Sequence, residues 1–316
     1  MTENKSPSSH VIYGQDDEID LLELWGILWV AKFFIVSMVI FFAAVSLIFS
    51  LLLTNIYRAE ALLAPADEES RQQITGQIGF AANLAGVNLG ENNTKTVNAL
   101  ATLRSREFTK KFIEEHNLLP WLFASEYDSS EGRSLINASL YNQETNAWLE
   151  VDSLFRAENR TSAPTDWEAY RKFSEIFTLS EQNDTGLVVI AIEWPDPVLA
   201  ALWVNNLVED INGHVKTKDM QEARSAINYL REQLENTQLV EMQQVLYQLI
   251  ESQTRTLMLA DIREGYVFET IDSAVVPEEK SKPFRSLIFL LGALVGGIIS
   301  VIYILMMHYK NPKLGG

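Results

Sequence analysis

Two uncharged apolar runs, one near each end of the chain, constrain its fold more than any other feature. Residues 33–53 and residues 287–307 each hold 21 residues without a charged side chain. A helix of that length is about 30 Å long, which matches the hydrocarbon core of a bilayer, and a helix satisfies its own backbone hydrogen bonds there. We therefore expect two membrane-spanning helices, at 33–53 and 284–307. A cleaved signal peptide fits the first run less well, because the apolar core of a signal is shorter and lies nearer residue 1.

Two spans place both ends of the chain on one side of the membrane and everything between them on the other. The basic residues of the short tails are Lys5, Lys32, Lys310 and Lys313. Lysine and arginine close to a span favour the cytoplasmic side. We therefore expect cytoplasmic tails at 1–32 and 308–316, with residues 54–283 exported.

The exported part is acidic and lacks cysteine. Residues 55–283 contain 20 lysines and arginines against 36 aspartates and glutamates. Such a balance disfavours binding to nucleic acid or to an anionic lipid surface. The absence of cysteine from the whole chain excludes disulfides, thiol nucleophiles and thiolate metal sites.

The pattern of apolar residues predicts an α/β base domain over 54–195. Residues 57–64 and 266–276 read as strands next to the two spans, and residues 187–193 as a central strand of the same sheet, because six apolar residues follow one another there. Residues 100–115 read as one helix that stops near Pro120. Residues 76–90 hold four glycines but match no phosphate-binding motif, so we expect a loop of small residues.

Residues 196–264 are expected to form a helical projection. Asp196 and Pro197 suit the first positions of a helix. Apolar positions then form a seam whose phase changes near residue 238, and a turn between 236 and 239 would fold the two stripes together as an antiparallel hairpin with arms of 20 to 24 residues. The alternative is one long helix with a stutter. The seam of the hairpin is predicted at Ile227, Leu230, Leu234, Met242, Leu246 and Leu249.

No group of residues typical of an active site stands out in the sequence, and we expect no catalytic residue, cofactor or metal. His116 and His214 are far apart in the sequence. We interpret each as a surface or core histidine whose ring nitrogens have ordinary hydrogen-bond partners. In the second span, Gly292 and Gly296 form a GxxxG pattern, with Gly297 beside it. Small residues of this kind let two helices approach closely, although glycine is also simply common in membrane helices.

Several segments together resemble a known family. They are IDLLELWGILWVAKFFI, YRAEALLAP, GFAANLAGVNL, NALATLRSREFTKKFIEEHNLLPWLF, WPDPVLAALWVNNLVEDIN and IDSAVVPEEKSKPFRSLIFLLGALVGG. In order and spacing they resemble the Wzz-type chain-length determinants, the polysaccharide co-polymerases of bacterial inner membranes. The likeness covers nearly the whole chain, with an interruption at 121–180.

The resemblance implies an α+β membrane protein with an α/β base domain in the periplasm and a protruding α-helical hairpin. It also implies ring-like homo-oligomers that contact a Wzy-type polymerase and regulate the length of O-antigen or a related polysaccharide. The lipid-linked glycan is a further candidate partner. The approach to the membrane at 265–283 departs from relatives, since it has only Pro277 and Pro283. Larger relatives carry a tyrosine kinase, but only nine residues follow Met307, so no nucleotide chemistry is expected. A two-span periplasmic sensor and a membrane-anchored glycan hydrolase are the alternatives.

Overall fold

A computed structural model describes residues 21–66, 91–128, 131–149, 163–182, 184–263 and 265–310. The predicted glycine-containing loop at 76–90 lies outside these residues. The chain divides into two compact units, one made of residues 1–53 with 284–316 and the other of residues 54–283.

The first unit consists of helices from both ends of the chain. They are α1 (Leu21–Val30), α2 (Lys32–Leu52) and α11 (Arg285–Lys310). The segments Lys32–Leu52 and Arg285–Met307 are long and apolar enough to cross a bilayer, and both leave most of their apolar side chains exposed. The two predicted spans are therefore confirmed as apolar helices. In α1 the rings of Trp25 and Trp29 stack with their centroids 6.3 Å apart.

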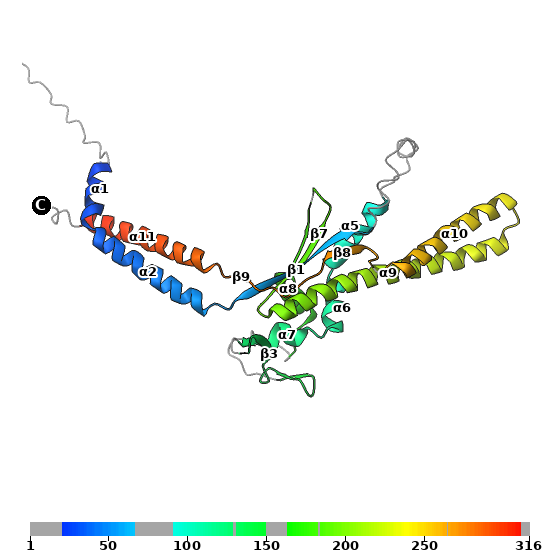
Figure 1. Ribbon diagram of the computed structural model, residues 1–316, viewed down its shortest axis with the longest axis horizontal. Helices are drawn as coiled ribbons and strands as arrows, with labels where there is room; N and C mark the ends of the chain where they lie inside the picture. The colour runs from blue at the N-terminus through cyan, green and yellow to red at the C-terminus, as the bar shows by residue number, and fades with distance from the viewer. Residues whose placement is uncertain are drawn as a thin grey trace, which may run out of the picture. The chain divides into compact units, whose positions relative to one another are not determined.

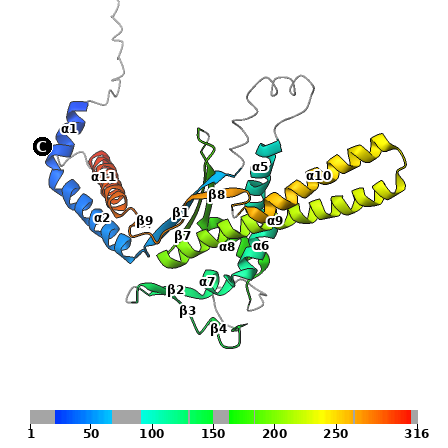
Figure 2. The ribbon, with the colours of Figure 1, turned by 45° about the vertical axis from the view of Figure 1, so that its right-hand side comes forward.

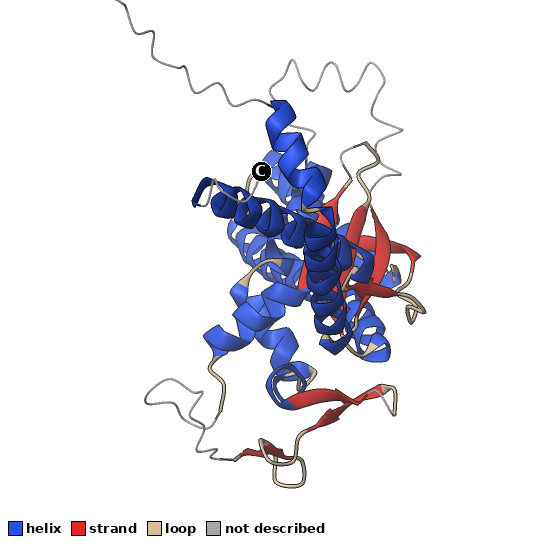
Figure 3. Cartoon of the chain, turned by 90° about the vertical axis from the view of Figure 1, so that its left-hand side faces the viewer, coloured by secondary structure: helices blue, strands red, loops and turns tan. Residues whose placement is uncertain are grey.

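The second unit combines a sheet with helices on one of its faces. Its described elements are β1 (Ile56–Pro65), α5 (Glu91–Leu103), α6 (Arg106–Glu115), α7 (Leu119–Ala124), β2 (Ser125–Asp128), β3 (Arg133–Ile136), β4 (Tyr141–Asn142), β5 (Ala147–Trp148), α8 (Asp166–Ile176), β6 (Phe177–Glu181), β7 (Val188–Trp194), α9 (Pro197–Asn236), α10 (Val240–Ile262), β8 (Phe268–Asp272) and β9 (Lys280–Lys282). The hairpins β2–β3 and β4–β5 lie apart from the main sheet (Figure 3).

The main sheet is antiparallel and runs in the order β6-β7-β1-β8, with β9 also paired to β1. The three predicted strands are confirmed, and β7 occupies the interior position expected of its apolar run. The last strand is shorter than predicted, because only 268–272 of the expected 266–276 pairs with β1.

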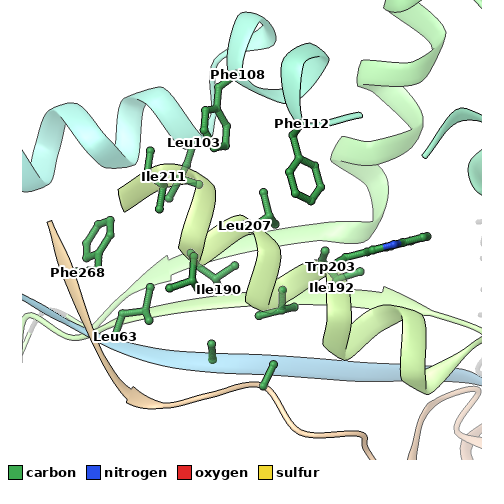
Figure 4. Packing of buried hydrophobic residues seen from close by; sticks show 14 of the residues in the cluster. Leu63, Leu103, Phe108, Phe112, Ile190, Ile192, Trp203, Leu207, Ile211 and Phe268 are labelled. Carbon is green, nitrogen blue, oxygen red and sulfur yellow. The ribbon is translucent and has the colours of Figure 1, made fainter. Parts of the chain in front are cut away.

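The first half of α9 covers this sheet and forms the core with it. On β1, Ala59, Ala61 and Leu63 alternate toward the helix, since side chains on a strand point to opposite faces in turn. Ile190 and Ile192 of β7 extend the same face. Figure 4 shows these strands beneath Trp203, Leu207 and Ile211 of α9, with Phe108 and Phe112 above the helix. Each of these large side chains contributes roughly 1.5 to 3 kcal/mol by leaving water.

The single helix predicted over 100–115 is wrong, because the chain breaks at Arg104 and Ser105 into α5 and α6. Ser105 has extended backbone angles, and its hydroxyl accepts a hydrogen bond from the backbone N–H of Phe108. A serine cap satisfies one of the free N–H groups at the start of a helix, which makes a new start at Arg106 favourable. The predicted end at residue 115 is confirmed, since α6 ends at Glu115, whereas Pro120 lies in the first turn of the next helix, α7.

The predicted helical hairpin is confirmed, and the alternative of one continuous helix is wrong. The helices α9 and α10 lie side by side in Figures 1 and 2, and residues 237–239 between them are not helical. Thr237 closes the turn, since its hydroxyl donates to the carbonyl of Gln233 and its own carbonyl accepts from the Gln243 side chain. The arms are unequal, because α9 runs for 40 residues and α10 for 23.

The seam of the hairpin differs in part from the prediction. Ile227 and Leu246 are buried, and Leu230 and Leu234 are half-buried. Met242 and Leu249 are 49% and 45% exposed, so their assignment to the seam is wrong. The positions of α10 that are least exposed are Gln243, Leu246, Ile250, Gln253, Thr256, Leu257 and Ala260. Polar residues occupy part of this stripe, which is why apolar spacing alone selected the wrong face.

Candidate functional site

Both ends of the second unit meet at β1, where the chain leaves for the two apolar helices. Ile56 pairs with Lys282 and Tyr57 with Lys280, so the segment after α2 and the segment before α11 lie in adjacent strands. Lys282 donates to the carboxylate of Glu193 on β7 at 2.6 Å. The sheet thus connects the two segments that enter and leave the apolar helices. Pro277 lies between β8 and β9, and Pro283 directly follows β9.

Asp196 joins the start of α9 to the small hairpin β2–β3. One carboxylate oxygen accepts from the backbone N–H groups of Val198 and Leu199, which caps α9 as predicted. The other accepts from the backbone N–H of Ser134 at 2.7 Å. Partial desolvation raises the pKa of the nearby Tyr127, with smaller contributions from Tyr57 and Asp196.

Two asparagines of α9 hold the chain as it returns toward the second apolar helix. The side-chain oxygen of Asn212 accepts from the backbone N–H groups of Val267 and Phe268, and its amide donates to the carbonyl of Phe268. In the same way, the amide of Asn205 donates to the carbonyl of Ala274, and its side-chain oxygen accepts from the N–H of Ala274. Sequence reasoning missed both residues. The available signal was two amides seven positions apart on the apolar face of a helix.

The glycines predicted for helix packing lie against the first apolar helix of the same chain. A Cβ at Gly292 would collide with the side chain of Ser46. A Cβ at Gly296 would lie 2.8 Å from the Cβ of Phe42. Gly297 is different, since a Cβ there would make only an ordinary contact of 3.7 Å with Val39. Ser46 also donates to the carbonyl of Ile288 at 2.8 Å. Gly292 and Gly296 therefore allow α2 and α11 to approach closely.

A concavity in the second unit lies between α6 and α9. We call it the Gly213 groove, and it encloses about 550 Å³. Its floor contains Phe108 and Phe112, and its walls carry Lys111, Glu115, Glu209, Asp210, Thr217 and Lys218. His214 packs edge-on against Phe108, with the ring centroids 5.8 Å apart.

The two histidines of this region have polar or aromatic partners, as predicted. His116 lies 2.8 Å from the carboxylate of Asp210 through Nε2, and its Nδ1 lies 3.1 Å from the amide of Asn206. Among the described residues, no three His, Asp or Glu side chains gather in a way that would hold a metal ion. On the outer side of α6, a hydrogen bond to Asp166 raises the pKa of Lys110, and the charges of Asp166 and Glu114 add to the effect.

Two stretches of the chain, one toward each end, are similar to known protein families. Residues 17–116 match the family described as Wzz, chain length determinant protein. Residues 230–309 match the family described as GNVR, the G-rich domain on putative tyrosine kinase. The first match spans α1, α2, β1, α5 and α6, and the second spans the end of α9, α10, β8, β9 and nearly all of α11.

One curated relative is the tyrosine-protein kinase etk of Escherichia coli. The chain is 31% identical over 104 residues to this protein of strain K12 and equally to that of strain O127:H6. The aligned part is 33% of this chain, and it covers only 13% of the length of the kinase.

Two solved structures show weak similarity. One is a full-length bacterial polysaccharide co-polymerase, at 12% identity and a TM-score of 0.40, covering 94% of this chain and 100% of that chain. The other is a fragment of WzzB, a polysaccharide co-polymerase from Salmonella Typhimurium, at 12% identity and a TM-score of 0.30, covering 72% of this chain and all of the fragment. Similarities at these scores do not define the fold. The family match is therefore confined to residues 17–116, which hold the first apolar helix and the strand that follows it and which are similar to the Wzz chain length determinant proteins.

Proposed function

We propose that this protein is a non-catalytic regulator of the length of a lipid-linked polysaccharide, O-antigen or a related glycan, that a Wzy-type polymerase makes. The observation that carries the proposal is the match of residues 17–116 to the chain length determinant family. The regulator acts as a ring-like homo-oligomer in the bacterial inner membrane. Its tails at 1–32 and 308–316 are cytoplasmic, and residues 54–283 are periplasmic.

The architecture suits a scaffold that holds binding surfaces at fixed positions. The helix α9 holds 40 residues, which corresponds to about 60 Å at 1.5 Å per residue. Its first half is fixed to the sheet by buried side chains, and its second half pairs with α10. A rigid element of this length can present one surface to neighbouring copies and another to a polymerase or its glycan.

Deletion of the gene tests the proposal. We expect glycan synthesis to continue while the distribution of chain lengths on a lipopolysaccharide gel broadens or shortens, since the proposed role is regulation and not synthesis. Full-length protein supplied from a plasmid should restore the original distribution. An unchanged ladder would refute the proposal, complete loss of polymer would indicate an essential synthetic role, and release of new reducing ends by purified protein would indicate a hydrolase.

A further inference from the structure

Gly213 lies inside the continuous helix α9, and no neighbour among the described residues packs closely enough to require a glycine there. It lies within α9, with sixteen residues of the helix before it and twenty-three after it. Glycine inside a helix is less stable than alanine, because it loses more backbone freedom on folding. Such a residue is commonly explained by a neighbour that leaves no space for a side chain. At Gly213 a Cβ would meet no atom within 4 Å.

The space in front of Gly213 is the Gly213 groove between α6 and α9. Glycine is used where a ligand approaches the backbone closely. Because Gly213 lines the groove without a side chain, the backbone of α9 is accessible at this position. A volume of about 550 Å³ lies within the range of roughly 300 to 1,000 Å³ that is usual for sites of small ligands.

The walls of the groove favour a neutral ligand rich in hydroxyl groups. The lining carries both signs of charge, on the ammonium groups of Lys111 and Lys218 and on the carboxylates of Glu115, Glu209 and Asp210. An anion or a cation would each meet groups of its own sign there. Lys111 and Glu115 are themselves paired, with a nitrogen–oxygen distance of 3.5 Å. A hydroxyl group both donates and accepts hydrogen bonds, and it can therefore use both kinds of wall group. The hydroxyl of Thr217 adds a further partner of this kind.

We propose that the Gly213 groove binds a short carbohydrate segment of the growing glycan. The proposal rests on the proposed function, which supplies a carbohydrate as the molecule that the protein must sense. It assigns Lys111, Glu209 and Lys218 to contacts with sugar hydroxyls, and Gly213 to the close approach of a sugar ring to the helix.

Gly213→Ala separates a binding role from a structural one. The methyl group should raise the melting temperature of the full-length protein in detergent, because alanine favours the helix and the Cβ has free space. It should also obstruct the groove and weaken carbohydrate binding by about tenfold, which corresponds to roughly 1.4 kcal/mol. A substitution that stabilises the fold and weakens binding is not expected of a purely structural glycine.

The control is Asn228→Ala, an exposed position of the same helix. It raises helix propensity in the same way but does not line the groove. The probe is an oligosaccharide of a few repeat units, released from the polysaccharide of the same strain by mild acid and freed of lipid. Binding is measured by isothermal titration calorimetry with full-length protein. We expect the wild type and Asn228→Ala to bind equally and Gly213→Ala and Lys218→Met to bind more weakly.

Three outcomes would overturn the inference. One is equal binding by the wild type, Gly213→Ala and Lys218→Met. Another is no binding by the wild type while gene deletion still alters the ladder, and in that case the proposed function stands without this site. The third is that Gly213→Ala leaves binding intact but disrupts the oligomer seen after chemical cross-linking, which would make the groove an interface between copies of the chain. An unaltered ladder after gene deletion would instead refute the proposed function, and the binding measurement would show separately whether the groove takes carbohydrate.

Discussion

At the scale of single residues, Asn212 is the side chain with the largest expected effect on the second unit. It is 8% exposed and serves three backbone groups of the returning chain. An amide offers an acceptor and a donor, as a neighbouring strand would, so it satisfies the backbone at 267–268 from the side of α9. Asn205 repeats the arrangement at Ala274. These two residues fix the returning chain to the helix that carries the hairpin.

Asn212→Leu should therefore destabilise the protein strongly. Leucine has the same number of side-chain heavy atoms in the same branched arrangement, although its methyl groups are bulkier. It leaves the N–H groups of Val267 and Phe268 without their acceptor, at a cost of about 1 to 3 kcal/mol for each buried group. We expect a loss of about 3 kcal/mol in the free energy of unfolding, measured by denaturant titration of the full-length protein in detergent. The exposed Asn228→Ala serves as the control. Equal stability of wild type and Asn212→Leu would show that water replaces the amide.

At the scale of elements, the seam of the hairpin determines which substitutions matter. Leu246 is 8% exposed and Met242 is 49% exposed, although both were predicted in the seam. We expect Leu246→Ala to lose about 2 to 4 kcal/mol by creating a cavity, and Met242→Ala to lose less than about 1 kcal/mol. Denaturant titration of the two variants measures the difference. If the face of α10 that carries Met242 were the buried one, Met242→Ala would lose more stability than Leu246→Ala.

The contact between α2 and α11 can also be tested directly. Because the natural chain has no cysteine, Val39→Cys with Gly297→Cys places one thiol on each helix where the structure shows an ordinary contact. We expect this pair to form a disulfide within one protomer on oxidation, visible as a mobility shift on a gel.

Adding Gly292→Leu and Gly296→Leu to that pair should abolish the disulfide, because both new side chains would meet α2. Adding Leu294→Ala, at an exposed position of α11, is the matched control and should leave it intact. A disulfide that persists in the double leucine variant would show that these glycines do not set the distance between the helices.

At the scale of the whole molecule, the chain leaves its first apolar helix, forms the second unit and returns beside its starting strand. The pairing of β1 with β9 brings both ends of residues 54–283 together. A loop of this kind between two spans requires both tails to lie on one side of the membrane.

We predict that the tails are cytoplasmic and the hairpin periplasmic. Single cysteines at Ser8 and Ser252 are to be treated with an impermeant thiol reagent in intact spheroplasts. Ser252 is exposed on α10, so its cysteine should react at once, whereas the cysteine at Ser8 should react only after the membrane is opened. A third cysteine at Ser130, outside the described residues, should behave like that at Ser252. Reaction at Ser8 without reaction at Ser252 would reverse the orientation.

The sequence by itself determined the elements whose signal is local. Two uncharged runs of 21 residues specify apolar helices, because a helix of that length satisfies its backbone hydrogen bonds within the segment itself. The run of six apolar residues at 187–192 specifies an interior strand, and the change of phase near residue 238 specifies the turn of the hairpin. Asp196 was recognised as a cap because a cap acts on residues two and three positions away.

Only the tertiary structure decided the contacts between residues that are distant in sequence. It selected Leu246 over Met242 because burial depends on which face of α10 meets α9, and a stripe that is partly polar does not reveal that face. It placed Gly292 against Ser46, 246 positions earlier, whereas the glycine pattern indicates only that some helix comes close. It joined Asn212 to Phe268 and opened a groove at Gly213, because α6, α9 and the returning chain come together only when the sheet has formed.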